Sequence, residues 1–235
     1  MSLERWEKDD SLVARIESLD WRQRYQTAVL ALRRLRAPVL EIAMPAEWGI
    51  PLDLVSSIFA TLTAEPSNAL ADAIHTAADE LQTAPLFSSE WDPGLTQEVQ
   101  LETIGALLRL NDRLMDLDVD SAEYIVYKTR AMTTYLDEFV ADSLTPNPAE
   151  DTHQRYHSQL GDEVGVYGLD YFGSRNIELE LACHAGIVQQ SPDEGFFSSA
   201  AGRELLELCD DYSTELLTAL RRVDPAAGSA HGGGA

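Results

Sequence analysis

Apolar residues recur at spacings of three and four along most of the chain, which is the pattern of amphipathic helices. The first clear stripe predicts a helix from about Asp20 to Arg36. Pro38 is expected to end this helix, because proline lacks a backbone N–H and its ring clashes with the preceding turn. The inward side of the helix is predicted to consist of Tyr25, Ala28, Val29, Leu32 and Leu35.

Two shorter helices are predicted next. Pro51 suits the first position of a helix over PLDLVSSIFATL. A backbone N–H at that position has no acceptor within a helix, so proline loses no hydrogen bond there. Ser67 is placed to cap the following helix through its hydroxyl. The inward stripe of that helix is expected to be Leu70, Ile74, Ala77 and Leu81. The stretch APLFSSEWDPG is typical of a loop, because Pro93 and Gly94 punctuate it.

Two long helices follow, the first from about Thr96 to Asp116. The second is expected to begin at Asp120, whose side chain can cap it. Glu123, at the third helical position, can accept the Asp120 N–H in return, as in a capping box. The break DLDVDS is short, so these helices should pack as antiparallel neighbours. The inward residues are predicted to be Ile104, Leu107, Leu108 and Leu114 on the first helix, and Ile125, Met132, Leu136, Phe139 and Val140 on the second.

Residues 143–200 contain most of the glycine-rich and aromatic loop sequence. Within them NIELELACHAGIV alternates enough for a strand, but its Glu and Ala residues favour a helix. A last helix spans about Ser199 to Arg222, with Leu205, Leu208, Tyr212, Leu216 and Leu220 inside. We therefore predict an all-α, antiparallel helical bundle in one domain over residues 1–225. Residues 143–200 form its loop-rich elaboration before the C-terminal helix, and residues 226–235 are a disordered tail.

Several segments resemble an uncharacterised, all-helical bacterial family known as domain of unknown function 416. The resemblance rests on apolar and a few polar positions in IESLDWRQRYQTAVLALRRL, LDLVSSIFATLT, TIGALLRLNDRLM, EYIVYKTRAMTTYLDEF and ELLELCDDYSTELLTALRR, about half of the chain. Residues 143–200 depart from the family, which is more compact there. The resemblance implies an all-α fold without an established activity. Some helical proteins of this general kind are immunity proteins that block toxins, which favours binding over catalysis.

The chain is strongly acidic, with 40 Asp and Glu against 17 Lys and Arg and a formal net charge of −23. Such a chain repels phosphate backbones and anionic lipid surfaces, so we expect no nucleic-acid and no membrane partner. Between residues 37 and 108 there are eleven acids and no Lys or Arg. This stretch is therefore a candidate docking surface for a cationic partner. A general acidic drift of the proteins in a high-salt or high-GC organism is the alternative, since Arg outnumbers Lys by 15 to 2.

No apolar run is long enough to cross a bilayer, and the charged N-terminal residues lack the apolar region of a signal peptide. A cytoplasmic location is therefore expected. Cys183 and Cys209 are too few for a disulfide framework and are expected to be reduced thiols. Phosphate-loop, dinucleotide-binding and nucleophile-elbow motifs are all absent from the sequence.

The stretch EDTHQRYHSQLGDE, residues 150–163, is a candidate metal site. His153 and His157 are four residues apart, so on a helix both imidazoles could bind one divalent transition metal. Gln154 stands where a hydrolytic zinc helix has its general-base Glu, and it cannot accept a proton. The third ligand would be Glu150, Asp162, Glu163 or His184. The alternative is a solvent-facing helix, and no cofactor is expected in that case.

Two other charged groups have plain structural interpretations. Asp116, Asp118 and Asp120 match a calcium-loop spacing, but Ser121 and Tyr127 replace the required Gly and Glu, so a turn with a helix cap is expected. A second group, Arg22, Arg33 and Arg36, could grip a phosphate or carboxylate or could pair with the chain's own acids. Asp210 and Asp211 are expected on a helix surface.

The loop GDEVGVYGLDYFG is the candidate protein-binding site. Aromatic side chains beside acids on an irregular loop can hold a basic protein surface, unless the aromatics fold inward to cover the bundle. The residues concerned are Asp162, Glu163, Tyr167, Asp170, Tyr171 and Phe172. We therefore predict a cytoplasmic protein-binding module, of the immunity or antitoxin type, that occludes a basic partner. The alternatives are a metal-dependent enzyme using His153 and His157, and a structural homo-oligomer.

Overall fold

Every regular element in the described part of the chain is a helix, as predicted. The computed structural model describes residues 10–143, 171–190 and 195–224, with the backbone alone for residues 10 and 140–143. The α-helices are α2 (Asp10–Glu17), α3 (Trp21–Arg33), α4 (Arg36–Glu41), α5 (Leu52–Thr61), α6 (Asn68–Gln82), α7 (Leu95–Asn111), α8 (Val119–Ser143), α10 (Tyr171–Gln189) and α11 (Ala200–Val223). Short 3₁₀ helices are η1 (Ala46–Trp48), η2 (Pro85–Ser88) and η3 (Phe196–Ser198).

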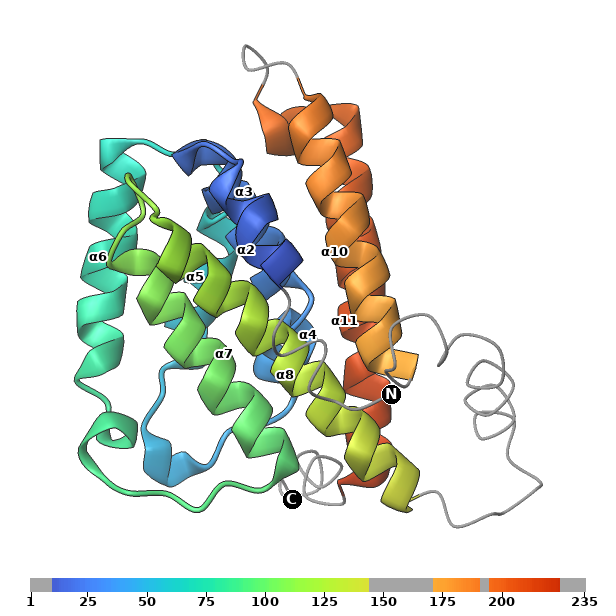
Figure 1. Ribbon diagram of the computed structural model, residues 1–235. Coiled ribbons are helices and arrows are strands. Elements are labelled where there is room, and N and C mark those ends of the chain that lie inside the picture. Colours follow the sequence, from blue (N-terminus) through green and yellow to red (C-terminus); the bar gives the residue numbers. More distant parts are fainter. Residues whose placement is uncertain (1–9, 144–170, 191–194, 225–235) are drawn as a thin grey trace.

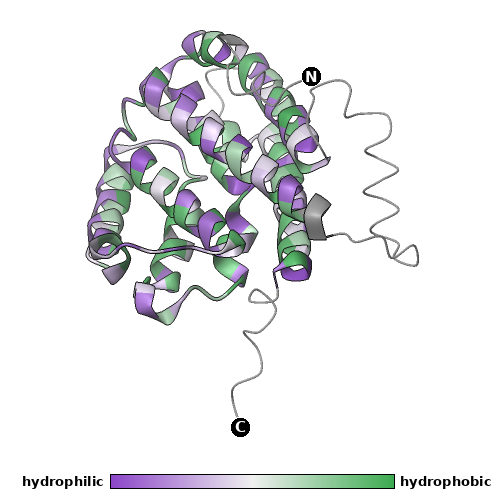
Figure 2. Ribbon diagram, turned by 60° about the horizontal axis from the view of Figure 1, so that its bottom comes forward, coloured by the Kyte–Doolittle hydropathy of each residue, from purple (hydrophilic) through white to green (hydrophobic). Residues whose placement is uncertain are grey.

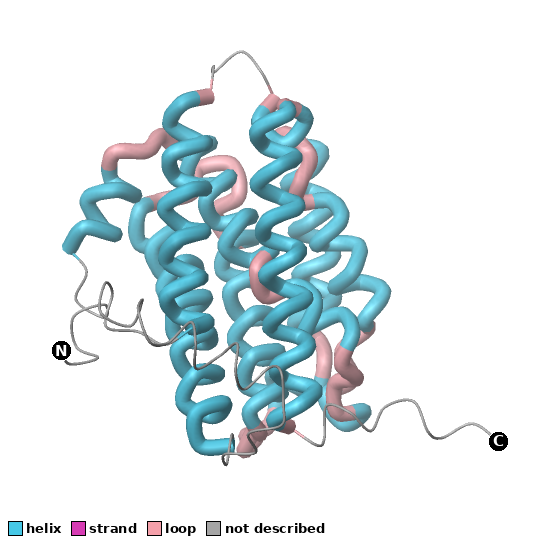
Figure 3. Tube along the Cα trace, turned by 90° about the vertical axis from the view of Figure 1, so that its right-hand side faces the viewer, coloured by secondary structure: helices cyan, strands magenta, loops and turns pink. Residues whose placement is uncertain are grey.

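The long helices run roughly parallel or antiparallel to one another, which gives a bundle (Figures 1 and 3). Helices α10 and α11 form an adjacent pair on one side, and α6 lies at the opposite edge of the molecule (Figure 1). Helix α3 packs against α7, α8, α10 and α11 and so occupies the interior. The other helices carry hydrophilic and hydrophobic residues on different sides, as amphipathic helices do (Figure 2).

The first predicted helix is divided in two. Asp20 caps α3 by accepting the Gln23 N–H at 2.9 Å, and the Gln23 side chain accepts the Asp20 N–H at 3.1 Å. The helix ends at Arg33, before any proline. Pro38 lies in the first turn of α4, where an N–H has no intrahelical acceptor. The prediction that Pro38 ends the helix was therefore wrong.

Helices α5 and α6 are close to the prediction. Pro51 is the residue before α5 rather than its first residue. Ser67 caps α6 as expected, since its hydroxyl accepts the Leu70 N–H at 3.2 Å. The predicted loop after α6 contains η2, which approaches Gly49 closely. Gly49 has a φ of 62°, and a Cβ there would lie 2.6 Å from Pro85 Cδ, so glycine is required at this position.

Helices α7 and α8 pack against each other and run in opposite directions, as their short connection predicted (Figure 1). The cap of α8 differs from the prediction, because Asp118 rather than Asp120 accepts the Ser121 N–H, at 2.7 Å. Hydrogen bonding by Ser121, through its side chain and then its backbone N–H, lowers the pKa of the Asp118 carboxyl. Phe139 was predicted to face inward, but 37% of its surface is exposed.

The segment NIELELACHAGIV is helical, as predicted, and lies within α10. Ser199 caps α11 by accepting the Gly202 N–H at 3.0 Å. Leu208 is 36% exposed rather than inside, while the other predicted residues of this stripe are buried. They are Leu205, Tyr212, Leu216 and Leu220. The helices enclose two neighbouring apolar clusters, one around α3 and one between α4, α8, α10 and α11.

Candidate functional site

The clearest surface feature is an acidic lobe, which we define as residues 51–92 with helices α5, α6 and η2. It contains seven carboxylates and no Lys or Arg, and all seven carboxylates are exposed. They are Asp53, Glu65, Asp72, Asp79, Glu80, Glu90 and Asp92. Helix α6 carries three of them at the edge of the molecule farthest from the α10–α11 pair (Figure 1). The sequence-based expectation of a surface without positive charge is therefore confirmed for this lobe.

Little within the described residues neutralises these carboxylates. Asp79 forms an ion pair with His75, whose Nε2 lies 3.6 Å from Asp79 Oδ2, and no ion pair is found for the other six among the described residues. By contrast, two acids that flank the lobe are paired. Glu102 binds Lys128 at 2.6 Å, and Glu41 lies 4.0 Å from Arg221. The lobe therefore presents a local concentration of negative charge to solvent.

Two exposed apolar side chains lie among these acids. Leu52 is 40% exposed and Phe87 is 41% exposed. They belong to neighbouring segments, because Gly49, three residues before Leu52, contacts Pro85, two residues before Phe87. Protein-binding surfaces combine exposed apolar side chains with charged ones.

The lobe is held firmly to the body of the bundle. The buried Tyr25 of α3 donates its hydroxyl proton to Leu62 O at 2.6 Å, and burial together with the Glu65 carboxylate raises the pKa of Tyr25. Trp48 and Trp91 pack edge to face with ring centroids 6.3 Å apart. The indole N–H of Trp91 donates to Leu86 O at 2.9 Å. These contacts make the acidic lobe a preformed surface.

The loop proposed from the sequence as the protein-binding site is only partly described. Asp162, Glu163, Tyr167 and Asp170 lie outside the described residues. Tyr171 and Phe172 were expected in the loop but belong to the first turn of α10. Phe172 is buried, and Tyr171 donates its hydroxyl proton to Glu215 at 3.1 Å, so both aromatic side chains pack on the bundle.

The proposed metal ligands His153 and His157 also lie outside the described residues, as do Glu150, Asp162 and Glu163. His184 is described and lies on α10, where burial and the nearby Arg15 lower its pKa. Within the described ranges, no group of three or more His, Cys, Asp or Glu is placed to hold a metal ion. The metal site stays a prediction from the sequence.

The arginine cluster is divided between two environments. Arg33 binds the Asp210 carboxylate at 2.5 and 2.6 Å, and Arg36 lies 3.8 Å from the same carboxylate. Arg22 instead packs on the ring of Trp21, with its guanidinium carbon 5.2 Å from the centroid. Intramolecular pairing is therefore confirmed for Arg33 and Arg36.

A buried polar network that joins α2, α8, α10 and the residue after α3 was not found from the sequence. Arg130 binds Glu180 through two hydrogen bonds of 2.7 and 2.5 Å, and Arg15 reaches the same carboxylate at 2.9 Å. Arg34 donates to Asn176 O at 2.9 Å. The inward position of Arg130 could have been predicted, because it lies four residues after the buried Val126 and so falls on the inward stripe of α8.

The start of α10 is bound by a second buried acid. Asp137 on α8 accepts the N–H groups of Phe172 at 2.9 Å and Gly173 at 2.7 Å. A carboxylate at a helix N-terminus accepts hydrogen bonds from N–H groups that have no partner within the helix, and its negative charge interacts favourably with the positive end of the helix dipole. Asp137 and the Arg130–Glu180 pair therefore fix α10 against α8, and we interpret the network as structural.

The two cysteines lie close together, which the sequence could not show. Their Sγ atoms are 3.9 Å apart between α10 and α11, and both thiols are buried. The hydrogen bond between them lowers the pKa of Cys183 and raises that of Cys209. They are free thiols, as expected.

Comparison with known proteins found no matching family model, no matching curated protein and no matching solved structure. The resemblance to domain of unknown function 416 therefore stays a prediction from the sequence. None of the described helices is both long and apolar enough to span a membrane.

Proposed function

We propose that the protein binds a basic partner protein through the acidic lobe. The observation that supports this proposal is the set of seven exposed carboxylates, without any Lys or Arg, in the same lobe as the exposed side chains of Leu52 and Phe87. Charge complementarity speeds association and selects a partner of opposite charge, while buried apolar anchors slow dissociation. Its most concrete form is an immunity-type inhibitor in the cytoplasm that covers a basic site on its target.

The test compares two variants that lose the same charge on opposite sides of the molecule. The lobe variant combines Asp53→Asn, Glu80→Gln and Glu90→Gln. The control variant combines Asp211→Asn, Glu204→Gln and Glu207→Gln on exposed positions of α11. Each protein is tagged and purified from its host at low and at physiological ionic strength, and the retained proteins are identified by mass spectrometry.

We expect the wild type and the control to retain the same basic protein in stoichiometric amount, and the lobe variant to retain about tenfold less. Binding should weaken as salt is raised, because the attraction is screened. Retention of no basic protein, or equal retention by the lobe and control variants, would contradict the proposal. A wild type that recovers only copies of itself would support the homo-oligomer instead.

A third variant separates the lobe from the loop predicted from the sequence. Asp162→Lys with Glu163→Lys reverses the charge of that loop and leaves the lobe unchanged. Loss of the partner in this variant alone would assign the interface to residues 161–172, as the sequence predicted. The metal-dependent alternative is tested in the same preparations by native mass spectrometry, because a bound metal ion would disappear in His157→Ala.

A further inference from the structure

The two cysteines of the chain face each other between α10 and α11. Cys183 Sγ lies 3.9 Å from Cys209 Sγ, and the two residues are 3% and 0% exposed. The sulfur atoms of a disulfide are about 2.05 Å apart, so a bond requires these thiols to approach by roughly 2 Å. They are already in contact, and no other side chain has to leave the space between them.

A close approach of the two helices brings the thiols together. Gly186 lies one turn after Cys183 on α10, and Leu205 lies one turn before Cys209 on α11. A Cβ on Gly186 would be 2.7 Å from Leu205 Cδ1, so the absence of a side chain there lets the helices pack closely beside the thiols.

Hydrogen bonds at both ends of the pair fix how α10 and α11 lie against each other. Near one end, Ser199 donates its hydroxyl proton to the Gln190 side chain at 3.1 Å. Near the other end, Tyr212 donates its hydroxyl proton to Phe172 O at 2.6 Å. The thiols lie between these contacts, so the antiparallel register of the two helices holds them side by side.

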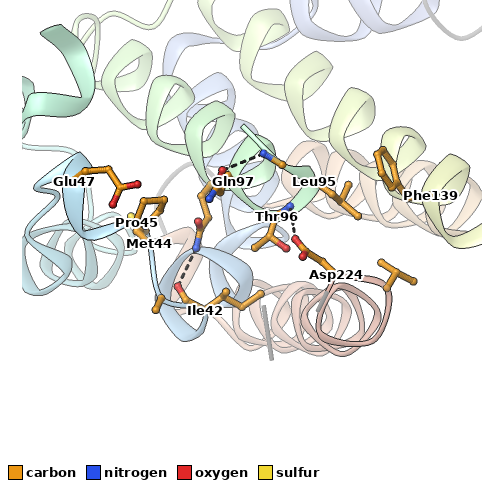
Figure 4. Close-up of a pocket in the computed structure, with 13 residues that line it drawn as sticks. Ile42, Met44, Pro45, Glu47, Leu95, Thr96, Gln97, Phe139 and Asp224 are labelled. Carbon is orange, nitrogen blue, oxygen red and sulfur yellow. Dashed lines mark hydrogen bonds between the residues drawn. The ribbon is translucent and has the colours of Figure 1, made fainter. Parts of the chain in front are cut away.

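Each helix is also held separately to the rest of the bundle. Helix α10 is bound to α8 through the two buried acids described above. On α11, Ser213 accepts the Ala37 N–H at 2.8 Å, and Asp224 at the helix end accepts the Thr96 N–H of α7 at 3.2 Å. Figure 4 shows the contact between Asp224 and Thr96. The thiols therefore belong to two anchored helices.

The surroundings of the pair give the two thiols different chemistry. The hydrogen bond from Cys209 lowers the pKa of Cys183 against the effect of burial, and the positive charge of the buried Arg34 lowers it further. Donating that hydrogen bond, together with burial, raises the pKa of Cys209. The thiolate is the nucleophile in thiol oxidation, so Cys183 is suited to react first and Cys209 to resolve the product.

We propose that Cys183 and Cys209 form a redox site that hydrogen peroxide oxidises to a disulfide and a small dithiol reduces again. The Cys183 thiolate attacks one peroxide oxygen, so that an S–O bond forms, the O–O bond breaks and hydroxide leaves to become water. Cys209 then gives up its proton and attacks the Cys183 sulfur, so that the S–S bond forms, the S–O bond breaks and a second water leaves. Two thiols are oxidised and one peroxide is reduced to two waters. The site is separate from the acidic lobe, so its test does not depend on the proposed protein partner.

The test treats the full, reduced chain with hydrogen peroxide, folded and in urea, in the presence of dimedone, which traps sulfenic acids. Cys183 and Cys209 fall in different tryptic peptides, residues 176–203 and 204–221, so a disulfide joins two peptides that are otherwise separate. We expect the folded chain to give this linked pair and at least about tenfold less dimedone adduct than the chain in urea, because the resolving thiol is already in contact. Dithiothreitol should then restore both thiols.

Single substitutions separate the two roles. Cys209→Ser removes the resolving thiol, so dimedone should accumulate on Cys183 in the folded variant. Cys183→Ser leaves only the buried Cys209, which should react at least about tenfold more slowly. Circular dichroism checks that both variants are folded, and the wild-type experiment stands without them.

Two results would overturn the proposal. One is a folded wild type that keeps both thiols at peroxide concentrations that oxidise the chain in urea, because burial would then exclude the oxidant. The other is a folded wild type that carries the dimedone adduct in place of the linked peptides. Equal reactivity of the two single variants would overturn the assignment of Cys183 as the first thiol to react.

Discussion

At the scale of single residues, the most consequential contact is the ion pair between Arg130 and Glu180, whose side chains are 2% and 4% exposed. Desolvation makes an isolated charge in such a place very unfavourable, whereas a paired and doubly hydrogen-bonded one is tolerated. Glu180 is also bound by Arg15, so one carboxylate holds three helices, α2, α8 and α10. Its removal should therefore affect the packing of α10 as a whole.

The substitution Glu180→Gln tests this role. It removes the charge that pairs with the buried Arg130, so we expect the free energy of unfolding to fall by about 3–5 kcal/mol. The matched control is Glu178→Gln on the same helix, where both Glu178 and its partner Arg175 are 41% exposed. An exposed pair contributes at most about 1 kcal/mol. Urea unfolding followed by circular dichroism measures both variants, and equal losses would show that the network does not stabilise α10.

At the scale of elements, the starts of several helices could be predicted from the onset of their apolar stripes. Ser67 caps α6 as predicted, and the helices expected from about Asp20 and about Ser199 each begin one residue later, with Asp20 and Ser199 as their caps. The start of α8 was misplaced because Asp118 and Asp120 are both competent caps two residues apart. Pro38 was misread because proline is excluded from a helix interior but not from its first turn.

The cap of α8 gives a prediction in which the two aspartates are each other's control. Asp118→Ala should lower the free energy of unfolding at neutral pH by about 1 kcal/mol, and Asp120→Ala should change it by much less. The folded-state pKa of Asp118 is lowered, so its contribution is present above the unfolded pKa of about 3.9 and is lost as pH falls through the folded pKa. The difference between wild type and Asp118→Ala should therefore stay constant from pH 7 to about pH 5 and shrink as the pH falls below about 4. A larger loss in Asp120→Ala would restore the cap predicted from the sequence.

At the scale of the whole molecule, the parts of the site that sequence could reveal were those that depend on composition alone. The absence of Lys and Arg between residues 37 and 108 indicated the acidic lobe. This could be predicted because charged side chains are usually exposed, so the net charge of a segment can be read without knowing its tertiary contacts. The inward position of Arg130 could be predicted from its spacing along α8, but the partners within the buried network could not. Some of these partners lie more than a hundred residues apart in the sequence, such as Arg34 and Asn176. Spacing along one helix carries no record of such contacts.

The same charge distribution predicts how salt affects the stability of the molecule. With a formal net charge of −23 and little pairing in the acidic lobe, like charges repel in the folded state more than in the expanded unfolded chain. Added NaCl shortens the screening length from about 30 Å at 0.01 M to about 10 Å at 0.1 M. We therefore expect the Tm to rise with NaCl by about 2–4 °C, as a gain of 1 kcal/mol would produce in a chain of this size.

The lobe variant should start from a higher Tm at low salt and rise less than wild type, because part of the repulsion is already removed. The α11 control variant should fall between the two, since Arg203 lies within one turn of Glu204 and Glu207 on the same helix. Differential scanning calorimetry at both salt concentrations measures all three proteins. A Tm that falls with NaCl in wild type would mean that attractive pairs, rather than the repulsion of the acidic lobe, dominate the electrostatics of the fold.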